Sequence, residues 1–320
     1  MNTIPLTFNE RLCNCTVLGG KEKILNVKYP ISVLLLGRHP GSYKEQSLEV
    51  LLNSGFENII TIENTKDNFK LEKYVQKFPQ VKFIVPTEKY TVGDLINLGM
   101  AECKSEYLLV LWDDFVLKNQ VFNDFLVNKI LALNCACYCP VFTNSDMQSI
   151  PVQMKPRIEK GSFEIIPSQV IYDNTYTLFP FDFVGVYNKD KFINIGGFDS
   201  TIKSSYWQNL DFSIRTWLRN EKIISSPIFK FSYEMSEPIM DTTIDSSYFR
   251  FYLKNIAPVY KKDYAYIPLT YFFQFHRRSS LSFASAMKEF KIVRKWVSKN
   301  AYHFKMDIKN LTEKWENLCD

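Results

Sequence analysis

Apolar and polar positions alternate along the first third of the chain in blocks that are typical of a layered α/β protein. Four short apolar runs without polar interruption predict strands that are buried on both faces, as in a parallel sheet. These runs are residues 31–36, 58–62, 81–85 and 107–112. Between them, leucines and other apolar residues recur at the spacing of a helix. The predicted helices cover residues 47–54, 71–78 and 92–103.

Strands and helices that alternate with short links predict a right-handed, mostly parallel sheet flanked by helices. In such sheets, ligands bind beyond the carboxyl ends of the strands. Three groups of polar residues follow the predicted strand ends, and we expect them to meet at one edge of the sheet. They are Gly37-Arg38-His39, Glu63-Asn64 and Asp113-Asp114.

The second half of the chain is less regular. Many polar residues and four prolines over residues 142–180 predict loops and short strands. Further along we expect a strand at 183–187, a helical turn at 190–195, and helices at 208–220 and 282–304. The predicted organisation is a lead-in (1–29), one α/β domain (30–270, with halves 30–140 and 141–270) and a helical C-terminal extension (271–320).

Composition narrows the classes of function. The chain has 320 residues, of which 46% are hydrophobic, and its net charge of +5 is too small to indicate a nucleic-acid-binding protein. No apolar run approaches the roughly 20 residues that a membrane-spanning helix needs. The first ten residues lack the basic start and apolar stretch of a secretion signal. We therefore expect a cytoplasmic protein, either free or peripheral at the inner face of the membrane.

The seven cysteines are expected to be reduced thiols. Cys135, Cys137 and Cys139 alternate along the chain, so on a strand they share one face. Because a zinc site needs four converging ligands, we interpret these three as small core residues, and Cys13 and Cys15 likewise.

Two carboxylates directly after a buried strand are the sharpest chemical signal. Asp113 and Asp114 can together bind a divalent cation and, through the cation, a diphosphate, because hard cations prefer oxygen ligands. The same pair can also serve as a turn or a helix cap at the strand end.

The order of the segments resembles that of the inverting family 2 glycosyltransferases, which have the GT-A fold. The family's opening strand "V-S-V-I-I-P-T-Y-N", its helix "S-L-x-S-L-L" and its strand "I-I-V-V-D-D" have counterparts in the first 64 residues. They are Ile31-Ser-Val-Leu-Leu-Leu-Gly-Arg-His39, Ser47-Leu-Glu-Val-Leu-Leu52 and Ile59-Ile-Thr-Ile-Glu-Asn64.

Later motifs of the family follow in the right order. They are "N-x-G-x-x-x-A-x-G-E-Y-I-L-F-L-D-x-D" and "G-G-F-D" followed by "E-D-x-D-L-x-x-R". Their counterparts are Asn97-Leu-Gly99 with Ser105-Glu-Tyr-Leu-Leu-Val-Leu-Trp-Asp-Asp114, Gly196-Gly-Phe-Asp199 and Gln208-Asn-Leu-Asp-Phe-Ser-Ile-Arg215. The similarity covers roughly residues 31–225 and implies a nucleotide-diphosphate sugar as donor, a UDP-sugar above all.

The resemblance also implies roles for individual residues. Glu63 would recognise the base and ribose, Asp113 would touch the ribose or a metal-bound water, and Asp114 would ligate Mn²⁺ or Mg²⁺. Gly37, Arg38 and Asn97 would complete the nucleotide pocket. A histidine and basic residues late in such domains complete the metal shell and neutralise the diphosphate, which implies His276 as a ligand and Arg277 and Arg278 as phosphate contacts.

Two departures from the family pattern bear on catalysis. Trp112 replaces the first Asp of the D-x-D motif. Asn209 replaces the Asp that removes the proton from the acceptor hydroxyl, and an amide does not take up a proton at neutral pH. Asp211 lies two residues further along and is our candidate for the base. Its alternative role is an ion pair with Arg215, four residues on.

The last long helix, at 282–304, carries a basic face beside an apolar stripe. It either lies at an anionic membrane surface, where lipid-linked acceptors are found, or packs on the domain with a solvated basic face. The sequence therefore predicts a metal-dependent inverting glycosyltransferase acting on a glycan, a lipid-linked or a protein-linked hydroxyl in cell-envelope glycan biosynthesis. The alternative is a catalytically inactive relative that binds a nucleotide sugar or a glycan.

Overall fold

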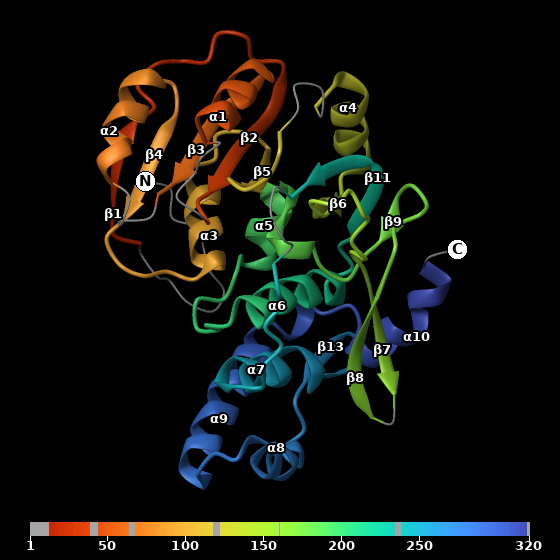
Figure 1. Ribbon diagram of the computed structural model, residues 1–320. Coiled ribbons are helices and arrows are strands. Elements are labelled where there is room, and N and C mark those ends of the chain that lie inside the picture. Colours follow the sequence, from red (N-terminus) through yellow and green to blue (C-terminus); the bar gives the residue numbers. More distant parts are fainter. Residues whose placement is uncertain are drawn as a thin grey trace.

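The computed structural model describes residues 13–38, 44–63, 68–117, 122–159, 161–233 and 238–318. Within them, a nine-stranded mixed sheet with the order β1-β4-β3-β2-β5-β10-β6-β11-β9 forms the centre of the molecule (Figure 1). Its strands are β1 (Cys15–Gly19), β2 (Tyr29–Leu36), β3 (Phe56–Ile62), β4 (Lys82–Pro86), β5 (Tyr107–Trp112), β6 (Cys137–Thr143), β9 (Thr175–Tyr176), β10 (Gly185–Asn188) and β11 (Ile223–Ser232).

The four predicted strands are confirmed and lie side by side as β4-β3-β2-β5, all parallel. Leu34 pairs with Val110 across β2 and β5, and both Leu34 and Leu109 are fully buried. Burial on both faces is why these strands consist of continuous apolar runs. Beyond β5 the sheet becomes mixed, because β10 runs antiparallel between β5 and β6.

The predicted helices are found with boundaries shifted by a few residues. Those of the first half are α1 (Lys44–Asn53), α2 (Asn68–Lys77), α3 (Val92–Glu102) and α4 (Asp124–Leu133). Those that follow are α5 (Lys189–Ile195), α6 (Ser205–Leu218), α7 (Ser246–Phe251), η3 (Tyr252–Ile256), α8 (Tyr271–Ser279), α9 (Phe283–Lys299), η4 (Ala301–His303) and α10 (Ile308–Leu318).

Two local expectations need correction, and the short strands expected within residues 142–180 are confirmed. The predicted lead-in contains β1, an edge strand whose side chains are largely exposed and so carry no hydrophobic period. The predicted strand at 183–187 begins only at Gly185, because Phe181–Phe183 form the 3₁₀ turn η2, in which Asp182 and Phe183 adopt a positive φ. The irregular segment contains a two-stranded hairpin, β7 (Gln153–Glu159) and β8 (Ser162–Ser168).

Cys135, Cys137 and Cys139 lie in the core, as expected from their spacing. The C-terminal helices lie on the side of the molecule away from β1–β4 (Figure 1). They are joined to the domain by the hairpin β12 (Val259–Lys261) and β13 (Tyr264–Tyr266). Of these helices, α10 packs against α6 and β7, whereas α9 packs against α8, η3 and β13. Among the described residues, no helix has both the length and the apolar character that crossing a membrane requires.

Candidate functional site

The three predicted polar groups follow the carboxyl ends of the neighbouring strands β2, β3 and β5. Backbone bonds continue past the strand ends, from Gly37 N to Ile62 O (3.3 Å) and from Asp113 N to Leu36 O (3.0 Å). The side chains that follow, Arg38 and Asp113, are therefore held next to each other. His39 and Asn64, which belong to the same predicted groups, lie outside the described residues.

Arg38 is at the centre of a cluster of carboxylates. Its backbone N–H donates to Asp113 Oδ1 (2.8 Å), and its Nη1 donates to Asp114 Oδ2 (3.1 Å). Its Nη2 contacts both oxygens of Asp182, at 2.6 and 2.7 Å. The guanidinium lies 4.0 Å from the ring centroid of Trp112, a cation–π distance. The Trp112 side chain, which departs from the family pattern, thus helps to orient Arg38.

Asp182 is a site residue that sequence reasoning missed. It lies in the η2 turn, where its backbone is left-handed (φ 53°) and its carbonyl accepts from Trp112 Nε1 (2.9 Å). Its carboxylate also accepts from the Tyr233 hydroxyl (2.9 Å). Burial raises the pKa of Asp182 to about 6, although Arg38 and Tyr233 favour the charged form. The sequence signal is weak, a single carboxylate between two phenylalanines.

Glu63, after β3, has a buried partner that the sequence did not indicate. Lys44, on α1, forms an ion pair with the Glu63 carboxylate, and Thr61 Oγ1 donates to Glu63 Oε1 (2.6 Å). Lys44 is only 5% exposed. Glu63 is therefore fixed at the sheet edge as an acceptor of hydrogen bonds, the property that recognition of a ribose or a base requires.

Asn97 and Gln208 lie at the junction between α3 and α6 and are engaged with the backbone. Asn97 exchanges two hydrogen bonds with Phe198, at 2.8 and 2.9 Å. Gln208 Oε1 accepts from Gly93 N (2.9 Å), and its amide nitrogen donates to Thr91 and to the Asp199 carbonyl. Asn97 therefore joins α3 to the segment that precedes α6. Among the described residues, no hydrogen bond links Asn97 with Arg38 or the strand-end carboxylates.

Asn209, which the sequence resemblance would align with the base of the family 2 enzymes, donates a hydrogen bond to the segment just before the Asp182 turn. Its Nδ2 donates to Pro180 O (2.8 Å), whereas its Oδ1 is buried without a hydrogen-bond partner. Asn209 therefore supports the η2 turn.

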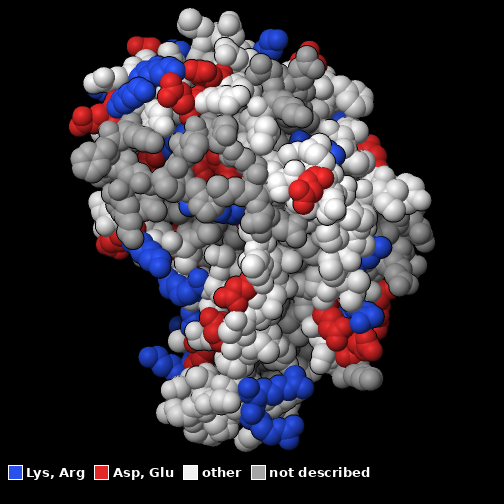
Figure 2. All heavy atoms as spheres, viewed as in Figure 1, with Lys and Arg blue, Asp and Glu red and all other residues white. Residues whose placement is uncertain are grey.

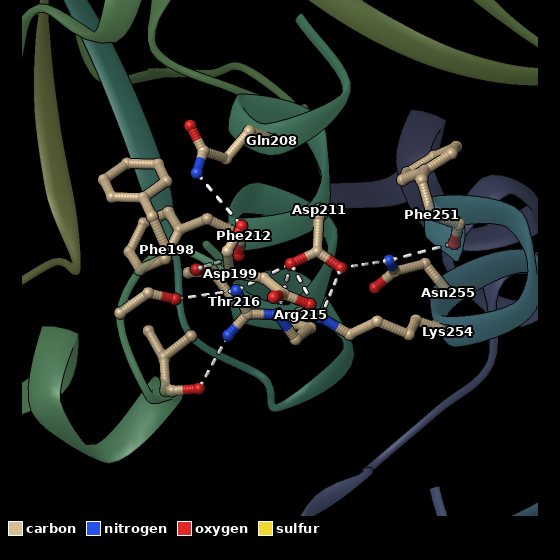
Figure 3. Close-up of polar contacts among 12 residues, drawn as sticks. Phe198, Asp199, Gln208, Asp211, Phe212, Arg215, Thr216, Phe251, Lys254 and Asn255 are labelled. Atoms are coloured by element: carbon tan, nitrogen blue, oxygen red, sulfur yellow. Dashed lines mark hydrogen bonds and ion pairs between the residues drawn. The ribbon is translucent and has the colours of Figure 1, made fainter. Parts of the chain in front are cut away.

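Asp211, the sequence candidate for the base, has no exposed surface. Its carboxylate is surrounded by the side chains of Arg215, Lys254 and Asn255 (Figure 3). Arg215 donates to Asp211 Oδ2 from Nε (2.9 Å) and Nη2 (2.8 Å). Lys254 Nζ lies 2.8 Å from Oδ1, and Asn255 Nδ2 donates to the same oxygen (2.8 Å). Burial alone would raise the pKa of Asp211, but the charges of Arg215 and Lys254 outweigh it and lower the pKa.

A general base has to reach the acceptor hydroxyl, and a carboxylate enclosed in this way does not. Of the two roles left open by the sequence, the ion pair with Arg215 is the one present. Lys254 also contacts Asp199 Oδ2 (2.8 Å), so two carboxylates and two cations form one buried cluster between α6, η3 and the turn before α6.

The predicted metal ligand His276 is not near Asp114. His276 lies on α8, which Figure 1 places at the end of the molecule away from β2 and β5. Its ring stacks on Phe272 and meets the edge of Phe283. Arg277 and Arg278 are exposed on the same helix. We expected these three residues to join the strand-end site, and the structure does not place them there. The helix that carries them, α8, packs on α9 at the far end of the molecule (Figure 1).

The donors at the strand ends fit a divalent cation only in part. Asp114 Oδ1 is buried and has no hydrogen-bond partner, so it is available as a ligand. The other oxygen of Asp114 is engaged by Arg38. In the part of the chain that is described, no three His, Cys, Asp or Glu side chains converge as a metal site would require. If a cation binds at this edge, Asp114 is the side chain that would hold it, and its remaining ligands would come from a bound diphosphate and water.

Comparison with known proteins identifies the fold. No family model and no curated protein sequence matches the chain. Solved structures do match it. GalNAc-T7 with UDP, GalNAc and Mn²⁺ superimposes with a TM-score of 0.61 at 11% identity, over 90% of this chain and 57% of that chain. TarS 1–349 of S. aureus in complex with UDP-GlcNAc gives 0.51 at 13% identity, over 84% and 72% of the two chains.

The chain therefore has the GT-A fold of these glycosyltransferases, a mixed sheet flanked by helices, as the sequence motifs implied. It spans little more than half the length of GalNAc-T7. At these identities the common property is the fold, and the inverting family 2 assignment stays a prediction.

Proposed function

We propose that the protein is a glycosyltransferase that moves a sugar from a nucleotide-diphosphate sugar, a UDP-sugar, to a hydroxyl acceptor. The observation that carries this proposal is the placement of Arg38, Glu63, Asp113 and Asp114 at the carboxyl edge of a GT-A sheet. This edge is where α/β sheets bind nucleotides. The acceptor is a glycan or a lipid-linked or protein-linked sugar.

Each residue of this edge has a part in the proposed reaction. Glu63 accepts hydrogen bonds from the base or ribose, and Asp113 does so from the ribose or a metal-bound water. Arg38 pairs with the diphosphate, whose charge increases as the sugar leaves, and a guanidinium suits bidentate contact with oxyanions. A cation on Asp114, Mn²⁺ or Mg²⁺, would supply further charge stabilisation.

For the base of an inverting reaction we propose Asp182 in place of Asp211. Asp182 lies at the ligand edge beside Arg38, and Asn209 supports its turn. A pKa of about 6 is close to that of an effective general base at neutral pH. Asp182 would take the proton of the acceptor hydroxyl as the hydroxyl attacks the anomeric carbon.

Calorimetry with UDP and GDP, each with and without Mn²⁺, tests the donor site. We expect UDP to bind in the presence of Mn²⁺, and Asp114→Ala to remove the Mn²⁺-dependent part of the affinity while the melting temperature stays nearly unchanged. Asp146→Ala, an exposed carboxylate on another loop, is the matched control. Unchanged binding by Asp114→Ala would show that the metal role is wrong.

The second candidate function is a nucleotide-sugar-binding protein without transferase activity. It is favoured by Asn209 at the position of the family's base and by the enclosure of Asp211. Asp182→Asn separates the two functions. For an enzyme, we expect turnover to fall at least a hundredfold while a UDP-sugar still binds. If the unmodified protein binds the donor but neither transfers the sugar nor hydrolyses the donor, the protein is a nucleotide-sugar-binding protein without transferase activity.

A further inference from the structure

The outer face of α9 carries a stripe of lysines. Lys288, Lys291, Lys295 and Lys299 are separated by steps of three, four and four residues, which places them on one side of a helix. All four are exposed, and within the described residues none of them forms an ion pair. The opposite side of α9 is buried against the molecule.

The lysine stripe belongs to a strongly basic part of the surface. Residues 259–306, from the start of the β12–β13 hairpin, contain ten Lys and Arg and two acidic residues, Asp263 and Glu289. Glu289 is engaged by the guanidinium of Arg250, so it does not offset the lysines. Figure 2 shows Lys and Arg gathered at the end of the molecule where Figure 1 places α8 and α9.

A groove with aromatic walls lies beside the lysine stripe. It has a volume of about 800 Å³ and is formed by α8, α9 and the β12–β13 hairpin. Lys291, Lys295 and Lys299 line it together with Phe272 and Phe290. Cations and apolar rings thus face the same space.

Large apolar side chains project into solvent around this groove. Phe273, Tyr302 and Leu269 are part of its lining and are 72%, 71% and 65% exposed. Exposed apolar residues that gather in one place mark an interaction surface, unlike those that are scattered singly.

We propose that α8, α9 and the β12–β13 hairpin form a docking surface for an anionic lipid membrane. The lysine stripe would lie over the headgroup phosphates, while Leu269, Phe273 and Tyr302 enter the interface between headgroups and acyl chains. Apolar and basic side chains on one surface are the combination that interfacial binding uses. A soluble anionic partner would account for the lysines but not for the projecting leucine and phenylalanine.

Vesicle co-sedimentation at physiological ionic strength tests the surface directly. We expect the full chain to bind vesicles of phosphatidylcholine with 30% phosphatidylglycerol and not vesicles of phosphatidylcholine alone. Lys291→Gln/Lys295→Gln/Lys299→Gln should weaken binding about a hundredfold, since each basic residue near an anionic surface contributes to the attraction. Leu269→Ser/Phe273→Ser should weaken it at least tenfold.

Matched variants elsewhere on the molecule provide the control. Lys21→Gln/Lys23→Gln/Lys104→Gln removes three exposed lysines, and Leu25→Ser/Phe125→Ser removes two exposed apolar residues. Both should bind vesicles like the unmodified protein. The proposal is overturned if these controls lose as much binding as the docking variants. Equal binding to neutral vesicles overturns it too, as does binding to soluble polyphosphate with none to vesicles. The assay needs no transferase activity, so its outcome is independent of the proposed function.

Discussion

At the scale of the residue, the strand-end site is organised around one arginine. Arg38 is in contact with three acidic residues and with the Trp112 ring. The indole of Trp112 fixes Arg38 from one side and the Asp182 turn from the other. Trp112 therefore acts as a rigid support for the Arg38 guanidinium.

The raised pKa of Asp182 predicts a specific pH dependence of stability. Its pKa is about 6 in the folded protein, against an ordinary value of 3.8. Between these values the folded state retains a proton that the unfolded state has released, so stability falls as pH rises toward 6. Asp182→Asn does not titrate. We expect the unmodified protein to lose about 2 kcal/mol relative to this variant between pH 4 and pH 7.

Urea unfolding at several pH values measures this difference. Asp146→Asn, at an exposed position, is the control, and its difference from the unmodified protein should not change with pH. If the difference in unfolding free energy between Asp182→Asn and the unmodified protein is also the same at every pH, the pKa of Asp182 is not raised.

The sequence predicted residues that follow strands better than residues whose place depends on packing. Arg38, Glu63, Asp113 and Asp114 come directly after apolar runs, so strand order alone brings their chain segments to one edge. Asp182 reaches the same edge from a distant turn, through a left-handed backbone that no local pattern indicates. The expectation for His276 failed because the resemblance gave only its position along the chain. It did not give the direction in which α8 leaves the domain, and that direction takes His276 away from the strand ends (Figure 1).

At the scale of the element, the buried charge cluster joins α6 to the segment that follows the sheet. Asp199 and Asp211 balance Lys254 and Arg215, and all four are at most 3% exposed. Arg215 also donates to the carbonyls of Ile195 (2.8 Å) and Gly197 (2.7 Å). The cluster thus fixes the glycine turn before α6.

Charge balance in this cluster predicts a coupling that a double-mutant cycle can measure. Asp211→Asn and Lys254→Met each leave a buried charge uncompensated, and each should cost about 3–5 kcal/mol of unfolding free energy. The double variant retains Asp199 with Arg215 and is neutral again. We expect it to be less destabilised than the sum of the single changes by about 1–3 kcal/mol.

Unfolding free energies of the four proteins, with the exposed Asp263→Asn as control, test this coupling. Additive effects would contradict the cluster. A hundredfold loss of turnover in Asp211→Asn at unchanged stability would instead return the role of base to Asp211.

At the scale of the whole molecule, the C-terminal helices are tied to the sheet domain at several points. Lys254 Nζ lies 4.6 Å from the Trp296 ring centroid, and Arg250 pairs with Glu289. Trp315 packs edge-on against Trp217 of α6, with centroids 4.8 Å apart. The helical nature of this segment could be read from its apolar stripe, but these contacts could not, because each joins residues far apart in the chain.

These ties predict that residues 271–320 and the sheet domain unfold together. We expect far-ultraviolet circular dichroism and tryptophan fluorescence to give one coincident transition, since a cooperative unit has no populated intermediate. Trp315 is 2% exposed, so Trp315→Ala should lower the unfolding free energy by about 3–5 kcal/mol and shift both signals equally. Phe125→Ala, at a 70% exposed position, should change little. Two separate transitions in the unmodified protein would contradict cooperative unfolding of the two parts. In Trp315→Ala, a shift of the fluorescence signal alone would show that the C-terminal helices unfold before the sheet domain.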